Sequence, residues 1–269
     1  LYLFYKKDKI NNYLLIFISC IILIVMSLTN ISLTTNYLLV KTPVLIILLS
    51  FMILGVYGSS KNMLITSRIS SIIISPTLLL TIISLWGLSS LVEFSNLLPL
   101  FNSNFKDFII ATLSFSAFSI LPNLLLLNYK NNLSFKEVSL GYIIGSIFII
   151  VLMFYIISIY GYELASISKY PEYLILKKVF IISNINNLEN VLILEWISCI
   201  FMTSLVCMNV LRDYLNKKLF YLIVSLIFIL VLFSLHKVFY LTILFQRYSN
   251  YCFFILLFVA FVTSRKKAH

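Results

Sequence analysis

One carboxylate in this sequence stands where carboxylates are rare. Glu195 lies several residues inside a long apolar stretch, where an ionisable side chain is costly and is by default a functional hypothesis. On a helix it shares a face with Cys199 and Met202, flanked by Ser198 and Thr203. We interpret Glu195, Ser198 and Thr203 as a candidate cation or proton site, whose carboxylate holds H⁺ or Na⁺ or is neutral through desolvation. The alternative is that Glu195 lies at the end of its helix and reaches water.

A second polar group surrounds a proline. Within residues 114–122 (SFSAFSILP), Ser114, Ser116 and Ser119 precede Pro122, which removes a backbone donor and clashes with the preceding turn. A helix broken here would leave backbone N–H and C=O groups free to bind a ligand. The alternative is a proline kink with the serines bonded to the preceding turn. The residues alone favour the kink.

Patterns for catalysis and for cofactors are absent from the sequence. It has no paired carboxylates, no Gly-x-Ser-x-Gly and no phosphate-binding loop. His236 falls between two apolar stretches and His269 is the last residue, so neither is a plausible buried base. The four cysteines all lie inside apolar stretches at spacings that suit neither zinc nor a redox pair. We therefore expect no enzyme, no metal and no cofactor.

The elements that carry these residues are apolar and long. Apolar residues make up 61% of the chain and charged residues 11%, and the mean hydropathy is +1.06. A membrane-spanning helix needs about 20 mostly apolar residues, and the runs lack the alternating polarity of a β-barrel. The sequence predicts an all-α polytopic membrane bundle, one domain over residues 1–269. Its eight spans are 12–32, 40–58, 70–90, 107–127, 139–160, 190–209, 219–235 and 250–263.

The basic residues indicate an orientation. The formal net charge is +11, but the Lys and Arg residues are scattered over loops and form no stripe that would suit nucleic acid. Of the 20 basic residues, thirteen fall in the gaps on the side of the two chain ends and seven on the other side. The positive-inside rule therefore predicts that both termini are cytoplasmic.

The longest predicted loop is 161–189, on the outer side. Pro171 suits the first turn of a helix there. The following run, 174–182, mixes apolar residues with two lysines and is expected to lie on the protein or membrane surface. In the fifth span, Gly141 and Gly145 are four residues apart, which predicts close approach of another helix.

Several short landmarks stand in a definite order relative to the spans. They are Thr42-Pro43, Gly58 followed by Arg68, the run 96–100 with Pro99, Tyr170-Pro171, and Leu188-Glu189 with Trp196. Each is weak alone, and their order makes the combination specific. Together they resemble the spore germination permeases, the B subunits of GerA-type germinant receptors in the amino acid/polyamine/organocation transporter superfamily. Asn187 departs from the family, which usually has a basic residue there.

The resemblance implies a LeuT-like fold of ten spans in two inverted five-helix repeats. The eight spans of this chain would correspond to the third to tenth spans of that fold. The first two helices would then be absent, and residues 1–5 are expected to be either the end of an earlier helix or an interfacial anchor. The first helix of each repeat is broken in such folds, which reverses the preference at 114–122. The implied ligand-binding residues are Ser114, Phe115, Ser116, Ser119 and Pro122.

By resemblance, the chain is expected to be a permease-like subunit of a spore germinant receptor that senses a small amino acid. The implied partners are an A-type membrane subunit and a C-type lipoprotein subunit, in the inner membrane of a spore or the cell membrane of a spore-forming bacterium. Two alternatives stay open: a secondary amino-acid transporter coupled to H⁺ or Na⁺, and an inactive truncated fragment. Pro99, Pro171, Glu189 and Trp196 are expected to be structural.

Overall fold

The computed structural model describes residues 12–61, 63–98, 134–168, 170–176, 178 and 188–236, with isolated positions between 104 and 126 and between 251 and 262. Within these residues every regular element is a helix, which confirms the all-α class. The long elements are α2 (Asn12–Leu33), α3 (Val44–Ser59), α4 (Met63–Leu88), α6 (Phe135–Ile167), α8 (Leu188–Tyr214) and α9 (Lys217–His236). The short ones are α7 (Pro171–Leu176), the π-helix η1 (Thr34–Leu38), and the 3₁₀ turns η2 (Ser89–Leu91) and η3 (Phe94–Leu97).

Five of the described helices are long and apolar enough to cross a membrane, and α3 is a shorter apolar helix. The chain is therefore a polytopic membrane protein. Helix α3 begins at Val44 and not at 40 because Pro43, with an extended backbone, precedes it. The predicted spans 107–127 and 250–263 lie largely outside the described residues. The five candidate spans are Asn12–Leu38, Met63–Leu91, Phe135–Ile167, Val191–Tyr214 and Lys217–Ser234.

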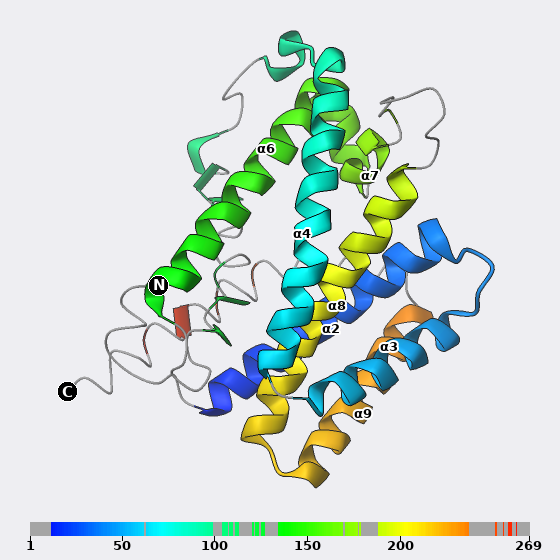
Figure 1. The fold of residues 1–269 in the computed structure, drawn as a ribbon, viewed down its shortest axis with the longest axis vertical. Coiled ribbons are helices and arrows are strands. Elements are labelled where there is room, and N and C mark those ends of the chain that lie inside the picture. Colours follow the sequence, from blue (N-terminus) through cyan, green and yellow to red (C-terminus); the bar gives the residue numbers. More distant parts are fainter. Residues whose placement is uncertain are drawn as a thin grey trace.

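Helix α8 runs through the middle of the bundle beside α2 and α4, and α3 and α9 lie together on its other side (Figure 1). Helices α2, α3, α8 and α9 share one apolar core, in which Ile22, Leu48, Met208 and Val231 are fully buried. At closest approach, a Cβ added to Gly58 of α3 would lie 2.6 Å from the Leu205 side chain of α8.

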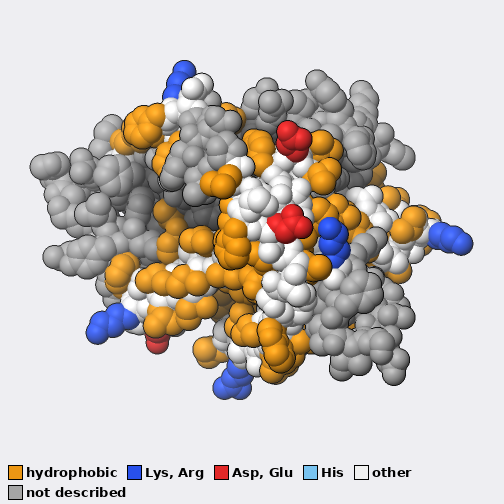
Figure 2. All heavy atoms as spheres, turned by 90° about the horizontal axis from the view of Figure 1, so that it is seen from above, with side chains coloured by type: hydrophobic (Ala, Val, Ile, Leu, Met, Phe, Trp, Pro, Cys, Tyr) orange, Lys and Arg blue, Asp and Glu red, His pale blue; other side chains and the backbone are white. Residues whose placement is uncertain are grey.

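Helices α4 and α6 keep much of their apolar surface exposed, as lipid-facing helices do. Ile72 of α4 and Ile150 of α6 expose 71% and 64% of their surface. Figure 2, which views the molecule from above, shows many hydrophobic and few charged side chains among the described residues. The expectation of close helix packing at Gly141 and Gly145 is wrong for the described residues: a Cβ at either position would meet nothing within 4 Å.

The two ends of α6 follow from local sequence. Ser134 caps its start, accepting a hydrogen bond from the Glu137 amide while the Glu137 carboxylate accepts one from the Ser134 amide. Near the other end, Gly161 has a φ of 71°, which interrupts the helical geometry where the predicted loop begins. Pro171 is the first residue of α7, as its position in the sequence predicts.

Candidate functional site

The polar side of α4 faces α8. Five of its small hydroxyl residues recur at spacings of three, four and seven, which on a helix confines them to an arc of about 60°. Thr66, Thr77, Thr81 and Ser84 are all buried, although their helix is otherwise largely exposed. The row is Thr66, Ser70, Thr77, Thr81 and Ser84. It makes the α4–α8 contact a polar interface within this apolar bundle.

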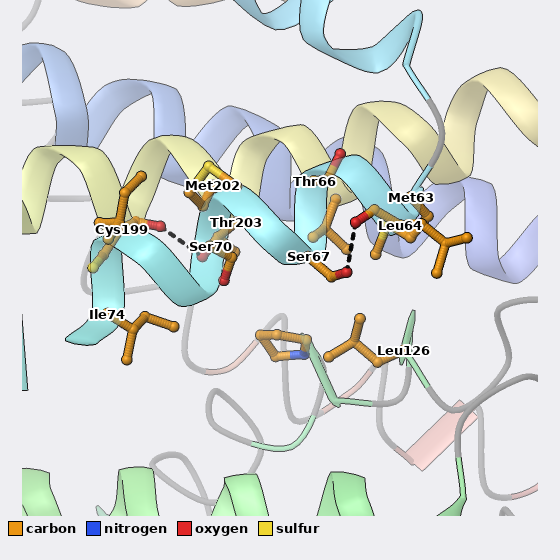
Figure 3. A pocket seen from close by; sticks show the side chains of 13 residues that line it. Met63, Leu64, Thr66, Ser67, Ser70, Ile74, Leu126, Cys199, Met202 and Thr203 are labelled. Atoms are coloured by element: carbon orange, nitrogen blue, oxygen red, sulfur yellow. Dashed lines mark hydrogen bonds between the residues drawn. The ribbon is translucent and has the colours of Figure 1, made fainter.

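A cavity of about 500 Å³ opens along the first half of this interface. Helix α4 forms one wall and α8 another, and Leu126 lies across from the first turns of α4 (Figure 3). Pro122 completes the described lining beside Leu126. The lining residues are Met63, Leu64, Thr66, Ser67, Ser70, Ile73, Ile74, Pro122, Leu126, Cys199, Met202, Thr203 and Val206. None of them is charged.

Two hydroxyl groups on the cavity wall have their hydrogens engaged. Thr203 donates to the carbonyl of Cys199 at 3.2 Å, and Ser67 donates to the carbonyl of Leu64 at 2.9 Å (Figure 3). A hydroxyl that donates to the backbone keeps oxygen lone pairs free to accept. The described walls therefore offer hydrogen-bond acceptors within an apolar surface, which suits a ligand that carries a donor such as an ammonium group.

Glu195 lies just beyond the cavity. Thr77 touches both the Glu195 carboxyl and the Cys199 thiol, and Cys199 is itself part of the cavity wall. The Thr77 hydroxyl donates instead to the carbonyl of Ile73 at 2.7 Å. The Oε2 atom of Glu195 is enclosed and has no hydrogen-bond partner among the described residues. An unpartnered carboxylate oxygen inside a membrane helix favours binding of a proton or a cation.

Comparison with known proteins identifies the family of this chain. A family model described as "Spore germination protein" matches residues 10–238, which include all helices from α2 to α9. The chain belongs to the spore germination permease family. This family is permease-like and not a family of enzymes, and its members are generally part of germinant receptor complexes. The searches of curated proteins and of solved structures found no match.

In this germination permease, the structure brings together two of the residues that the sequence singles out. Pro122 and Thr203 line the same cavity, and Glu195 lies one turn from its Cys199 wall. Ser198 lies on α8 away from the lining and donates to the carbonyl of Leu194 at 2.8 Å. The other ligand residues, Ser114, Phe115, Ser116 and Ser119, and also Pro99, lie outside the described residues, as does the side chain of Glu189.

Sequence reasoning missed the contribution of α4 to the site of the permease. Thr66, Ser67 and Ser70 form much of the cavity wall, and Thr77 contacts Glu195. The signal was present in the sequence as hydroxyl residues at helical spacing within an apolar span. Their role follows only from the position of α8, because hydroxyl residues also occur on helix faces with no ligand.

Proposed function

We propose that this permease-like protein senses a small amino-acid-type germinant, which binds in the α4–α8 cavity. The observation that carries the proposal is the cavity itself, with Pro122 and Thr203 on its wall and Glu195 beyond its end. The volume of about 500 Å³ accommodates a small ligand with its water. Apolar side chains such as Ile74 and Met202 would contact the ligand's hydrocarbon part.

The two charged groups of an amino acid would meet different parts of this site. The oxygens of Thr203 and Ser67 would accept from the ammonium group. The carboxylate would bind backbone N–H groups of a break at 114–119, as predicted from the sequence, and Pro122, three residues after that segment, lines the cavity.

Binding would trigger germination by favouring one of two conformations. A ligand shifts such an equilibrium only by its difference in affinity for the two states. We expect the change to pass to an A-type membrane subunit and a C-type lipoprotein subunit in the spore inner membrane, with both termini of this chain in the cytoplasm. We propose these partners and this location because members of the family are generally part of germinant receptor complexes.

Replacing one hydroxyl tests the site. Thr203→Val removes an acceptor from the wall while keeping the side-chain shape, so we expect germination to require a higher amino-acid concentration. Thr29→Val is the matched control: Thr29 is also half-buried, also donates to a backbone carbonyl one turn earlier, and lies on α2 away from the lining. Equal dose responses for wild type, Thr203→Val and Thr29→Val would remove the cavity from germinant recognition.

The unpartnered Oε2 atom of Glu195 favours a second candidate function, amino-acid transport coupled to H⁺ or Na⁺. Uptake of labelled amino acids into vesicles that contain the purified chain separates the two. Transport predicts accumulation that depends on a Na⁺ or pH gradient and is lost in Glu195→Gln. Sensing without transport predicts binding with no accumulation.

A further inference from the structure

A second, much smaller void lies farther along the α4–α8 interface, where α6 and α7 close it. Thr81 and Ser84 of α4, Tyr155 of α6, Glu172 of α7 and Trp196 of α8 line it. Its volume is about 10 Å³, at the lower limit for one water molecule. A hydrated metal cation does not fit in this space, whereas a proton needs only an acceptor.

The carboxyl of Glu172 is held in this void by contacts that fix α7. The Tyr160 hydroxyl donates to the carbonyl of Leu174 at 2.8 Å, and the Tyr170 hydroxyl donates to the Ser32 hydroxyl at 3.0 Å. The ring of Tyr173 packs on that of Tyr37, with centroids 4.1 Å apart. Glu172 is thus carried by a docked helix and not by an exposed tail.

The titratable surroundings of Glu172 are nearly free of charge. Facing it are Tyr155 from α6, Tyr37 from η1 and Tyr170 from its own loop, while α4 contributes only hydroxyl groups. From α8, Trp196 lines the void, and Glu195 is the residue before it. No described cation lies against the carboxyl, and burial raises the pKa of Glu172. The site therefore favours a carboxyl group that takes up a proton.

Each of the two glutamates lies near a different residue of the hydroxyl row of α4. Thr77, beside Glu195, and Thr81, beside Glu172, are one turn apart, about 6 Å along the helix axis. In the other direction the row continues into the large cavity as far as Thr66. From Thr66 to Ser84 it extends about 27 Å, close to the ~30 Å of a bilayer's hydrocarbon core.

We propose that Glu172 and Glu195 are the two proton-binding carboxyls of a proton path along the α4–α8 interface. The inference rests on the proposed assignment of Glu195 to a proton or cation and adds Glu172 as the entry site on the α7 side. A proton from water binds the Glu172 carboxylate and then passes to the Thr81 oxygen. The Thr81 hydrogen turns from the Thr77 carbonyl to the Thr77 hydroxyl oxygen, and the Thr77 hydrogen turns from the Ile73 carbonyl to the Glu195 carboxylate. Each transfer forms one O–H bond and breaks one.

Proton flux into vesicles tests the path. The purified full chain is reconstituted in liposomes that enclose a pH-sensitive dye, and a K⁺ gradient with valinomycin sets the potential. We expect the wild type to acidify the lumen faster than protein-free vesicles, and Glu172→Gln and Glu195→Gln to lose this flux. Glu163→Gln, which changes an exposed carboxylate of α6, is the matched control and should keep the wild-type rate.

Thr81→Val is a second test that does not depend on the folding of Glu172→Gln. It leaves both carboxyls in place and removes the Thr81 hydroxyl from the path. Loss of flux in Thr81→Val with unchanged helix content supports the path. A wild-type rate in Glu172→Gln or in Thr81→Val overturns it, as does a wild type no faster than protein-free vesicles. A wild-type chain that binds amino acid in the same preparation but conducts no protons overturns this inference alone and leaves the proposed function standing.

Discussion

The side-chain amide of Asn209 on α8 donates a hydrogen bond of 3.1 Å to the hydroxyl of Thr66 on α4, and both residues are buried. This bond closes the end of the polar interface that the large cavity occupies, since Thr66 is also part of the cavity wall. A polar pair between membrane helices aligns them because neither group finds a partner in lipid.

Separating that pair should loosen the α4–α8 contact. We expect Asn209→Ala and Thr66→Val to be coupled by about 0.6–1.7 kcal/mol, the range for interhelical hydrogen bonds in membranes. A double-mutant cycle on the free energy of unfolding in mixed micelles measures this term. The effects of Asn209→Ala and Thr81→Val should be additive, because Thr81 lies on α4 like Thr66 but lines the small void and not the large cavity. Additivity of the first pair would contradict the contact.

Close packing of α3 on α8 makes Gly58 sensitive to any side chain. A Cβ there would lie 2.6 Å from the Cδ2 of Leu205, a buried residue that must then shift. Gly58→Ala should destabilise the protein by about 1–3 kcal/mol through overpacking. Gly145→Ala should instead stabilise it by about 0.5–1 kcal/mol, because the helix gains alanine's propensity and a Cβ at Gly145 meets nothing within 4 Å. Equal effects of the two changes would argue against this packing.

Glu172 should make the stability of the fold depend on pH. Burial raises the pKa of its carboxyl above the ordinary value of 4.5, so the folded chain binds this proton more tightly than the unfolded chain. The stability that the fold gains from binding this proton is fully present below about pH 4.5 and is lost as pH rises through the raised pKa of Glu172. Thermal unfolding across this pH range should show that Glu172→Gln loses less stability than the wild type as the pH rises. Glu163→Gln should lose as much stability as the wild type. Identical pH profiles for all three proteins would show that Glu172 is not buried.

The docking of α7 should depend on Tyr160. Tyr160→Phe removes the donor to the Leu174 carbonyl, a bond of 2.8 Å, but keeps the ring that lies 4.2 Å from the Lys178 ammonium. Losing about 0.5–1.5 kcal/mol should speed amide exchange in α7 roughly two- to tenfold. Hydrogen–deuterium exchange followed by mass spectrometry measures this. Tyr162→Phe, at a tyrosine that exposes 75% of its surface, should leave α7 unchanged.

The sequence by itself determined the helices, the membrane and the family. Apolar runs predict where the chain crosses lipid, because every backbone polar group must there be satisfied within a helix. Pro171 marks the start of α7, and short landmarks from Thr42 to Trp196 indicate the family that the comparison confirms. The expectation of ligand residues at 114–119 stays a prediction, since these positions lie outside the described residues.

The tertiary structure alone decided which helices meet and what they enclose. Gly141 and Gly145 have the spacing of a packing motif, but a Cβ there would meet no described residue within 4 Å, whereas Gly55 and Gly58 lie against α8. Glu172 reads as a loop acid in the sequence, and docking of α7 puts it in a void with Trp196. The physical reason is that lipid is as apolar as the helices, so hydropathy does not select partners. Shape and a few polar contacts between segments far apart in the chain make that choice.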